Sequence, residues 1–315
     1  ISGIIRLAKR ILAGTAFFEG MGALVLTLRF ANEYGLAKAA ERGIFLSVSA
    51  FCNAGFDNLG KGGAFASVIP YKSDPAVLLT LSALVITGGI GFYVWNDLAE
   101  MSKGHKRTLS LHTKIVLCTT AVLLAVGTVG FFFFESDGVM AGESFMQRLL
   151  QSFFQAVTVR TAGFDHVGQG ELASTSKALS VLLMLIGGSP GSTAGGIKTT
   201  TAAVLAMAAI NALRGKKRLE AYGRTIPQKA VYDANCLFIL AGMAAITGAF
   251  ALAALERVAF GDAFFETISA IATVGLSVGI TPSLGAASRL LLSFLMFLGR
   301  VGIVTVGMAA LTRGS

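Results

Sequence analysis

The chain has 315 residues, of which 54% are hydrophobic and 14% charged, and its net charge is +9. Soluble domains carry about 25% charged residues, and a soluble fold of this length needs far more polar surface to cover itself, so the composition excludes a soluble protein and indicates a polytopic membrane protein. The excess of Lys and Arg is typical of cytoplasmic loops rather than of nucleic-acid binding, and three scattered cysteines exclude a disulfide framework.

Long and short apolar segments alternate along the chain. Because about 20 residues cross the hydrocarbon core, six segments are long enough to span it: 11–31, 76–98, 114–134, 177–210, 230–254 and 287–312. Three shorter stretches lie between them and are predicted to be re-entrant or interfacial helices: 42–52, 148–159 and 263–272. The sequence therefore predicts an all-helical fold in which the order long, short, long occurs three times.

An internal repeat runs through the short segments. Gly55, Gly163 and Gly275 lie 108 and 112 residues apart, and a phenylalanine stands ten positions before each of them. The polar, small and apolar positions around each glycine also match among the three segments. A pattern that recurs three times in this way is typical of a repeat architecture. We expect three units, which cover 1–104, 105–216 and 217–315.

The charges of the loops predict the orientation of the units. Basic residues gather before position 11 and in the loops 99–114 and 213–229. Cytoplasmic loops carry the excess of Lys and Arg, so these loops are predicted to be cytoplasmic. The short segments then enter the membrane from the opposite, external face.

A half-crossing helix, a glycine turn and a span together form the pattern of a cation pore. Non-helical backbone at membrane depth is tolerated where it lines a water-filled path, its carbonyls can replace the hydration shell of a cation, and glycine permits the required φ angles. A generic transporter could use one such glycine for packing, but three in register favour a filter. The predicted filter residues are Asn53, Ala54, Gly55, Thr161, Ala162, Gly163, Thr273, Val274 and Gly275.

The segment 177–210 is too long for one straight crossing. Pro190 and five neighbouring glycines break its helix, and a polar break within a span lines a pathway. We expect a gate on the cytoplasmic side of the filter, with a simple packing break as the alternative. Its predicted residues are Gly187, Gly188, Ser189, Gly191, Ser192, Thr193, Gly195, Gly196 and Lys198.

Two arginines fall at membrane depth. Arg300 lies in the last predicted span, where a charged residue is costly and indicates function; we expect an electrostatic barrier beside the gate, or else a structural arginine satisfied by backbone. Arg160 adjoins a filter turn, and we expect it to brace that turn from behind, because facing the ion would repel a cation. A serine hydrolase at Ser189 or Ser192 would need a nearby base, and no histidine lies at that depth, so we expect no enzyme.

These motifs resemble one membrane transport family along essentially the whole chain. The segments 47–56, 155–164 and 273–276 resemble the filters of the Trk/Ktr/HKT superfamily of potassium transporters, and most of all those of the Ktr-type membrane subunit of sodium-dependent potassium uptake. The segment 187–201 resembles the family's intramembrane gating loop, and 299–302 resembles its last pore-lining helix with a basic residue.

The resemblance implies further properties. Family members have four pore units, and the units here look like the second to the fourth, so we expect a first unit to precede Ile1. It implies K⁺ as the permeant ion, no other cofactor, a homodimer in the inner (plasma) membrane, and a cytoplasmic ring of nucleotide-binding regulatory subunits. Sodium dependence, a proton-coupled Trk-type transporter, and an unrelated secondary transporter for an organic solute stay open.

Overall fold

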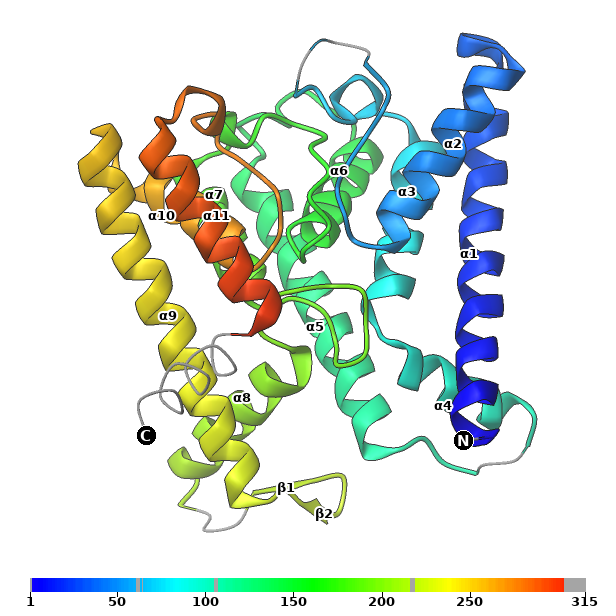
Figure 1. Cartoon of the computed structure of the whole chain (residues 1–315), viewed down its shortest axis with the longest axis vertical. Coiled ribbons are helices and arrows are strands. Elements are labelled where there is room, and N and C mark those ends of the chain that lie inside the picture. The colour runs from blue at the N-terminus through cyan, green and yellow to red at the C-terminus, as the bar shows by residue number, and fades with distance from the viewer. Residues whose placement is uncertain (1, 61–62, 64, 105–106, 216–218, 303–315) are drawn as a thin grey trace.

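The computed structural model describes residues 2–60, 63, 65–104, 107–215 and 219–302, and these residues fold almost entirely into helices (Figure 1). Within them, the only strands form the two-residue hairpin β1 (Glu220–Ala221) and β2 (Arg224–Thr225) in the basic loop 213–229. The expected all-helical architecture is confirmed.

Three groups of helices follow one another along the chain. The first holds α1 (Ser2–Tyr34), α2 (Leu36–Phe51), α3 (Pro75–Gly89) and α4 (Phe92–Ser102); the second α5 (Leu111–Phe134), α6 (Phe145–Thr158), α7 (Ser174–Leu185) and α8 (Thr199–Leu213); the third α9 (Gln228–Glu256), α10 (Phe260–Ile271) and α11 (Ala286–Val301). In Figure 1 the green second group lies between the blue first group and the yellow-to-red third group. All three predicted short segments are helices, namely α2, α6 and α10.

Small residues let the helices within a group approach closely. A Cβ atom added at Gly22 of α1 would lie 2.6 Å from Ser47 Oγ of α2, and one added at Gly43 of α2 would lie 2.6 Å from Thr27 Oγ1 of α1. Glycines at helix contacts are the usual means of close packing in membranes. The Ser47 hydroxyl also donates to the backbone carbonyl of Glu19 at 2.7 Å.

Three helices of the described chain are long and apolar enough to cross a membrane: Ala8–Tyr34, Leu111–Phe134 and Gln228–Glu256. The predicted span 76–98 is divided between α3 and α4, which together are long and apolar enough to cross but meet at an angle of 93°. Gly91 has a φ of 90°, which breaks the helix there. The predicted break of 177–210 is confirmed, since α7 and α8 are separate helices. Of the predicted span 287–312, the part beyond Gly302 lies outside the described residues.

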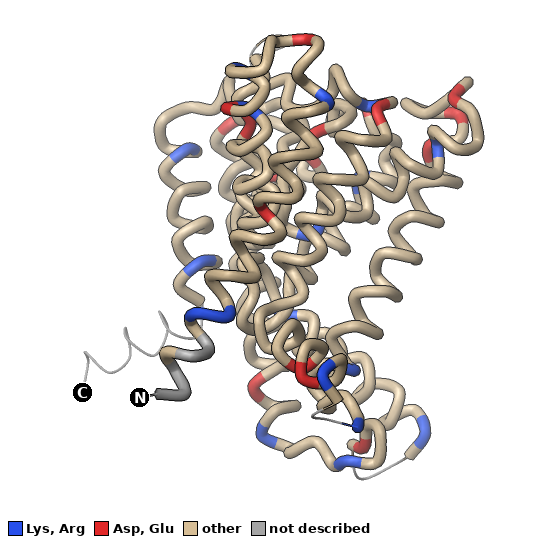
Figure 2. The backbone as a smooth tube through the Cα atoms, turned by 90° about the vertical axis from the view of Figure 1, so that its right-hand side faces the viewer, with Lys and Arg blue, Asp and Glu red and all other residues tan. Residues whose placement is uncertain are grey.

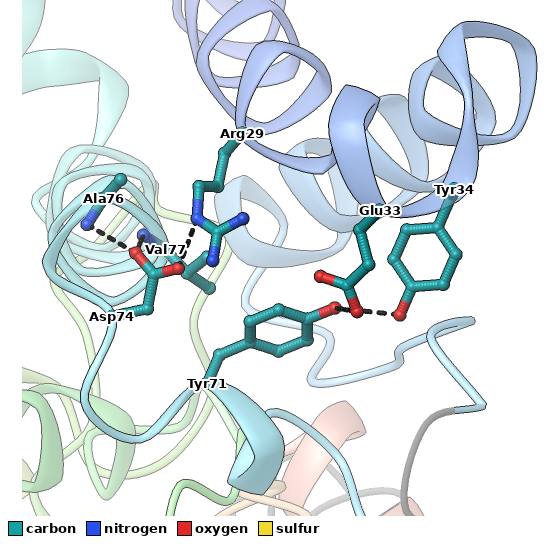
Figure 3. A network of polar contacts seen from close by, with 7 residues as sticks. All are labelled: Arg29, Glu33, Tyr34, Tyr71, Asp74, Ala76 and Val77. Carbon is teal, nitrogen blue, oxygen red and sulfur yellow. Dashed lines mark hydrogen bonds and ion pairs between the residues drawn. The ribbon is translucent and has the colours of Figure 1, made fainter.

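Charged residues gather toward the two ends of the molecule, and the middle is mostly uncharged (Figure 2). At the end away from the hairpin, polar contacts fasten the loop before α3 to α1 (Figure 3). Arg29 pairs with Asp74, whose carboxylate also caps two backbone amides of α3. The Tyr71 hydroxyl donates to Glu33 at 3.0 Å and lies 2.8 Å from the Tyr34 hydroxyl. Burial, with these two hydrogen bonds, raises the pKa of Tyr71.

Candidate functional site

The three glycine turns that follow α2, α6 and α10 meet at one place. Gly55, Gly163 and Gly275 have φ angles of 72°, 84° and 96°, in the left-handed region that favours glycine. A Cβ atom on Gly55 would lie 2.5 Å from the Ala162 carbonyl oxygen and 3.0 Å from Gly163 Cα, and one on Gly275 would lie 3.9 Å from Gly163 Cα. The structure thus brings the three predicted filter turns together and leaves no room for a side chain at the first two glycines.

The residue two positions before each glycine is also left-handed. Asn53, Thr161 and Thr273 have φ angles of 51°, 68° and 54°. Such a conformation in a residue other than glycine costs about 1–3 kcal/mol and is concentrated at ligand clamps. The sequence analysis missed this feature, because β-branched Thr rarely adopts left-handed backbone, and only Asn is enriched in it.

A hydroxyl at the end of each short helix fixes the carbonyl that follows the filter glycine. The donor and acceptor pairs are Ser49 Oγ to the Phe56 carbonyl at 2.7 Å, Thr158 Oγ1 to the Phe164 carbonyl at 2.7 Å, and Ser269 Oγ to the Leu276 carbonyl at 2.6 Å. Each turn is therefore closed by the same contact. The repeated hydroxyl residues five or six positions before each glycine are the sequence signal that could have predicted it.

The electrostatics of the turns favour a cation. The C-terminal ends of α2, α6 and α10 lead directly into them, and the C-terminal end of a helix carries partial negative charge. Asp165 follows the second turn, but burial raises its pKa to about 7 against the hydrogen bond from Gln169, so this side chain adds less negative charge than an ordinary aspartate and the helix ends carry the argument. Among the described residues, no group of three or more His, Cys, Asp or Glu side chains is placed to hold a metal ion.

The loop 186–198, which the sequence predicts to be a gate and which we therefore call the gating loop, is closed at its neck. Gly187 N–H donates to the Ile197 carbonyl at 2.9 Å, and Thr199 N–H donates to the Gly188 carbonyl at 3.0 Å. The buried Ser189 and Thr199 hydroxyls lie 2.9 Å apart. The segment is therefore an ordered loop with its own hydrogen bonds, rather than two helices joined by a loose connection.

The gating loop lies against the filter turns. Arg160 Nη2, just before the second turn, donates to the Gly187 carbonyl at 3.1 Å, and a bracing role for Arg160 stays a prediction. Thr193 Oγ1 is 3.0 Å from the Phe51 carbonyl oxygen, at the end of α2. A Cβ atom on Gly195 would lie 2.9 Å from the Ala272 carbonyl oxygen, beside the third turn.

The opposite side of the gating loop fills the bend between α3 and α4. Ser189 N–H donates to the Gly89 carbonyl at 2.9 Å, and Phe92 N–H donates to the Gly191 carbonyl at 2.9 Å. The bend therefore exposes backbone groups that the loop pairs. Sequence reasoning missed the contact, although Gly88 and Gly91 have the same three-residue spacing as Gly299 and Gly302 in the last unit.

Two basic side chains line a cavity beside the gating loop. The cavity has a volume of about 380 Å³, and its walls include Lys198, Arg300, Gly195 and Leu237. Lys198 Nζ donates to the Ala194 carbonyl at 2.8 Å. The two predicted gate cations therefore share one cavity, and within the described residues no hydrogen bond joins Arg300 to the loop.

The first filter turn has an uncovered flank. Phe56 is 69% exposed, whereas its counterparts Phe164 and Leu276 are buried. A cavity of about 600 Å³ lies beside it, with Phe45, Cys52 and Ala54 among its walls. The first turn is thus packed on fewer sides than the other two.

Comparison with known proteins adds the following. The sequence profile of the TrkH family, described as cation transport protein, matches residues 5–313. The chain is 38% identical to the potassium/sodium uptake protein NtpJ of Enterococcus hirae, over all of this chain and 69% of that protein, and 37% identical to the Ktr system potassium uptake protein B of Bacillus subtilis, over 97% of this chain and 67% of that protein. The solved potassium transporter TrkH of Vibrio parahaemolyticus superposes with a TM-score of 0.72 at 20% identity, over 91% of this chain and 62% of that one. The chain therefore spans about two thirds of the length of these relatives.

Proposed function

Because this chain belongs to the TrkH family of cation transport proteins, we propose that it is the pore-forming subunit of a potassium uptake system. The observation that carries the proposal is the meeting of three glycine turns, each at the C-terminal end of a short helix. The protein is a multi-pass membrane transporter and not an enzyme. Both uptake proteins to which it is similar are named for potassium.

In this proposal K⁺ binds to backbone carbonyls of the three filter turns, which cover 53–55, 161–163 and 273–275. Carbonyl oxygens replace the water that K⁺ loses on entering a filter. The left-handed glycines support this role because they free the backbone to turn, and the hydroxyl contacts of Ser49, Thr158 and Ser269 support it because they hold each turn in one shape.

A fourth filter turn completes the site in this proposal. A ring of carbonyls around an ion needs a ligand on every side, and the uncovered flank of Phe56 is apolar. A fourth turn packed there would give Phe56 the cover that Phe164 and Leu276 have. The turn belongs to a first unit of the same protein, as the family resemblance implies.

The gating loop closes the path on the cytoplasmic side of the filter. It lies under the turns at hydrogen-bond distance, and Lys198 and Arg300 beside it would repel a passing cation. The cytoplasmic face further carries the basic loops 99–114 and 213–229, where we place the contact with a ring of nucleotide-binding subunits. A homodimer completes the proposal.

The direct test is K⁺ or Rb⁺ uptake into a bacterium that lacks its own potassium uptake. The full-length protein should support uptake, and Gly163→Asp should abolish it, because Asp is strained at a φ of 84° and meets backbone of the neighbouring turns. Gly242→Ala is the matched control, since nothing lies within 4 Å of a Cβ atom there. A well-expressed full-length protein without uptake would overturn the proposal.

A further inference from the structure

We infer that Thr193 and Arg160 are positioning residues that fasten the gating loop to the filter, so that the loop sets ion selectivity as well as flux. The inference rests on the proposed function and deepens it. It follows from contacts between the loop and all three filter turns, each through a different part of the loop.

Thr193 joins the loop to the first turn. Its hydroxyl lies 3.0 Å from the Phe51 carbonyl oxygen and 3.2 Å from Asn53 Oδ1. Phe51 ends α2, and Asn53 is one of the left-handed filter residues. Because the hydroxyl has one proton, it donates to either oxygen in turn, and both positions hold the start of the turn against the loop.

Arg160 joins the loop to the second turn. Its side chain is buried, and Nη2 donates to the Gly187 carbonyl at 3.1 Å. Arg160 immediately precedes Thr161, a left-handed filter residue. A methyl carbon of Thr161, Cγ2, would lie 3.0 Å from a Cβ atom on Gly187. The guanidinium and the methyl group therefore fix the second turn to the neck of the loop from two directions.

Gly195 joins the loop to the third turn by packing alone. A Cβ atom on Gly195 would collide with the Thr273 hydroxyl and would lie 2.9 Å from the Ala272 carbonyl oxygen. No atom larger than hydrogen fits between the loop and this turn. The three contacts together mean that the loop cannot move without removing support from the filter.

Loss of that support has a predictable effect. When the loop leaves, the Phe51 and Gly187 carbonyls lose their side-chain donors, and the first two turns are free to relax. K⁺ and Na⁺ differ in size, so discrimination between them depends on where carbonyls are held and how many coordinate. We therefore expect a weakened loop contact to admit more Na⁺ relative to K⁺.

The test compares Thr193→Val with two other variants in the full-length protein. Rb⁺ uptake is measured with increasing Na⁺ as competitor, and the readout is the selectivity ratio. Since one hydrogen bond is worth about 1 kcal/mol, Thr193→Val should lower the ratio about fivefold, and Thr193→Ser, which keeps the hydroxyl, should restore it. Thr87→Val is the matched control, because the Thr87 hydroxyl donates only within its own helix, at 2.8 Å to the Ala83 carbonyl and 3.0 Å to the Leu84 carbonyl.

Ser189→Ala separates a contact within the loop from a contact with the filter. The Ser189 hydroxyl pairs with Thr199 of the loop neck, so its loss should alter flux and leave the selectivity ratio at the wild-type value. An unchanged ratio in Thr193→Val, or an equal change in Ser189→Ala, would overturn the inference while wild-type uptake still supports the proposed function.

A binding measurement covers variants that accumulate poorly. The rise in melting temperature on adding K⁺, compared with the rise on adding Na⁺, reports filter occupancy in purified protein. Thr193→Val and Arg160→Gln should both reduce the difference between the two ions. If both variants keep the wild-type difference, the inference fails; if the wild type itself shows no K⁺-dependent rise and no uptake, the proposed function fails first.

Discussion

Left-handed backbone at Thr161 and Thr273 is the least expected feature at the scale of single residues. Both are β-branched, and positive φ in such residues is a genuine outlier that costs about 1–3 kcal/mol each. The surrounding contacts hold the strain in place: the Thr158 and Ser269 hydroxyls bond the carbonyls that close the same turns. Strain at repeated positions supports a filter whose shape is fixed before the ion arrives.

Asp165 gives a prediction on pH. Burial, with the nearby Glu266 charge, raises its pKa from an ordinary value of 3.8 to about 7, against the hydrogen bond from Gln169. The raised pKa means that the folded state holds the proton of Asp165 more tightly than the unfolded state. The contribution of Asp165 to stability should therefore be highest below pH 4. It should fall as pH rises to about 7 and stay level above that value.

The measurement is the melting temperature of the purified protein across this pH range. Asp165→Asn should flatten the fall between pH 4 and 7. Asp137→Asn is the control, since Asp137 is exposed, and it should leave the profile unchanged. A wild-type profile that Asp165→Asn does not alter would contradict the raised pKa.

At the scale of elements, the bend between α3 and α4 depends on Gly91. Its φ is 90°, and a Cβ atom there would lie 2.8 Å from the Pro190 carbonyl oxygen of the gating loop. We predict that Gly91→Ala destabilises the protein by about 1–3 kcal/mol, seen as a lower melting temperature. Gly20→Ala in α1, where nothing lies within 4 Å, should have no such effect, and equal melting temperatures for the two variants would count against the role of Gly91.

The gating loop gives a second prediction at this scale. Deletion of its tip, residues 189–194, removes the polar segment that lies under the filter turns but keeps the ends of α7 and α8. We expect a higher rate of Rb⁺ uptake from the deleted protein, because the obstruction is gone. Lower or unchanged uptake in a protein that reaches the membrane in normal amount would show that the loop is not a gate.

At the scale of the whole molecule, the threefold internal repeat is the reason why much of the fold can be predicted from the sequence. The short helices and the glycines at 55, 163 and 275 are predictable because the same pattern occurs three times and each copy supports the others. The bend at Gly91 is not predictable from the sequence, because a glycine in an apolar segment ordinarily packs within a straight span. The partner of Arg160 is also not predictable, because its contact with Gly187, 27 residues away, exists only after the loop has folded under the turns.

The central claim is that the three glycine turns bind a dehydrated potassium ion. It is tested most directly by a crystal structure of the full-length protein grown in Rb⁺, with anomalous scattering used to locate the ion. The account predicts a Rb⁺ peak between the turns, within coordination distance of carbonyl oxygens of residues 53–55, 161–163 and 273–275. Rb⁺ bound elsewhere in the membrane region, with no peak between the turns, would contradict it.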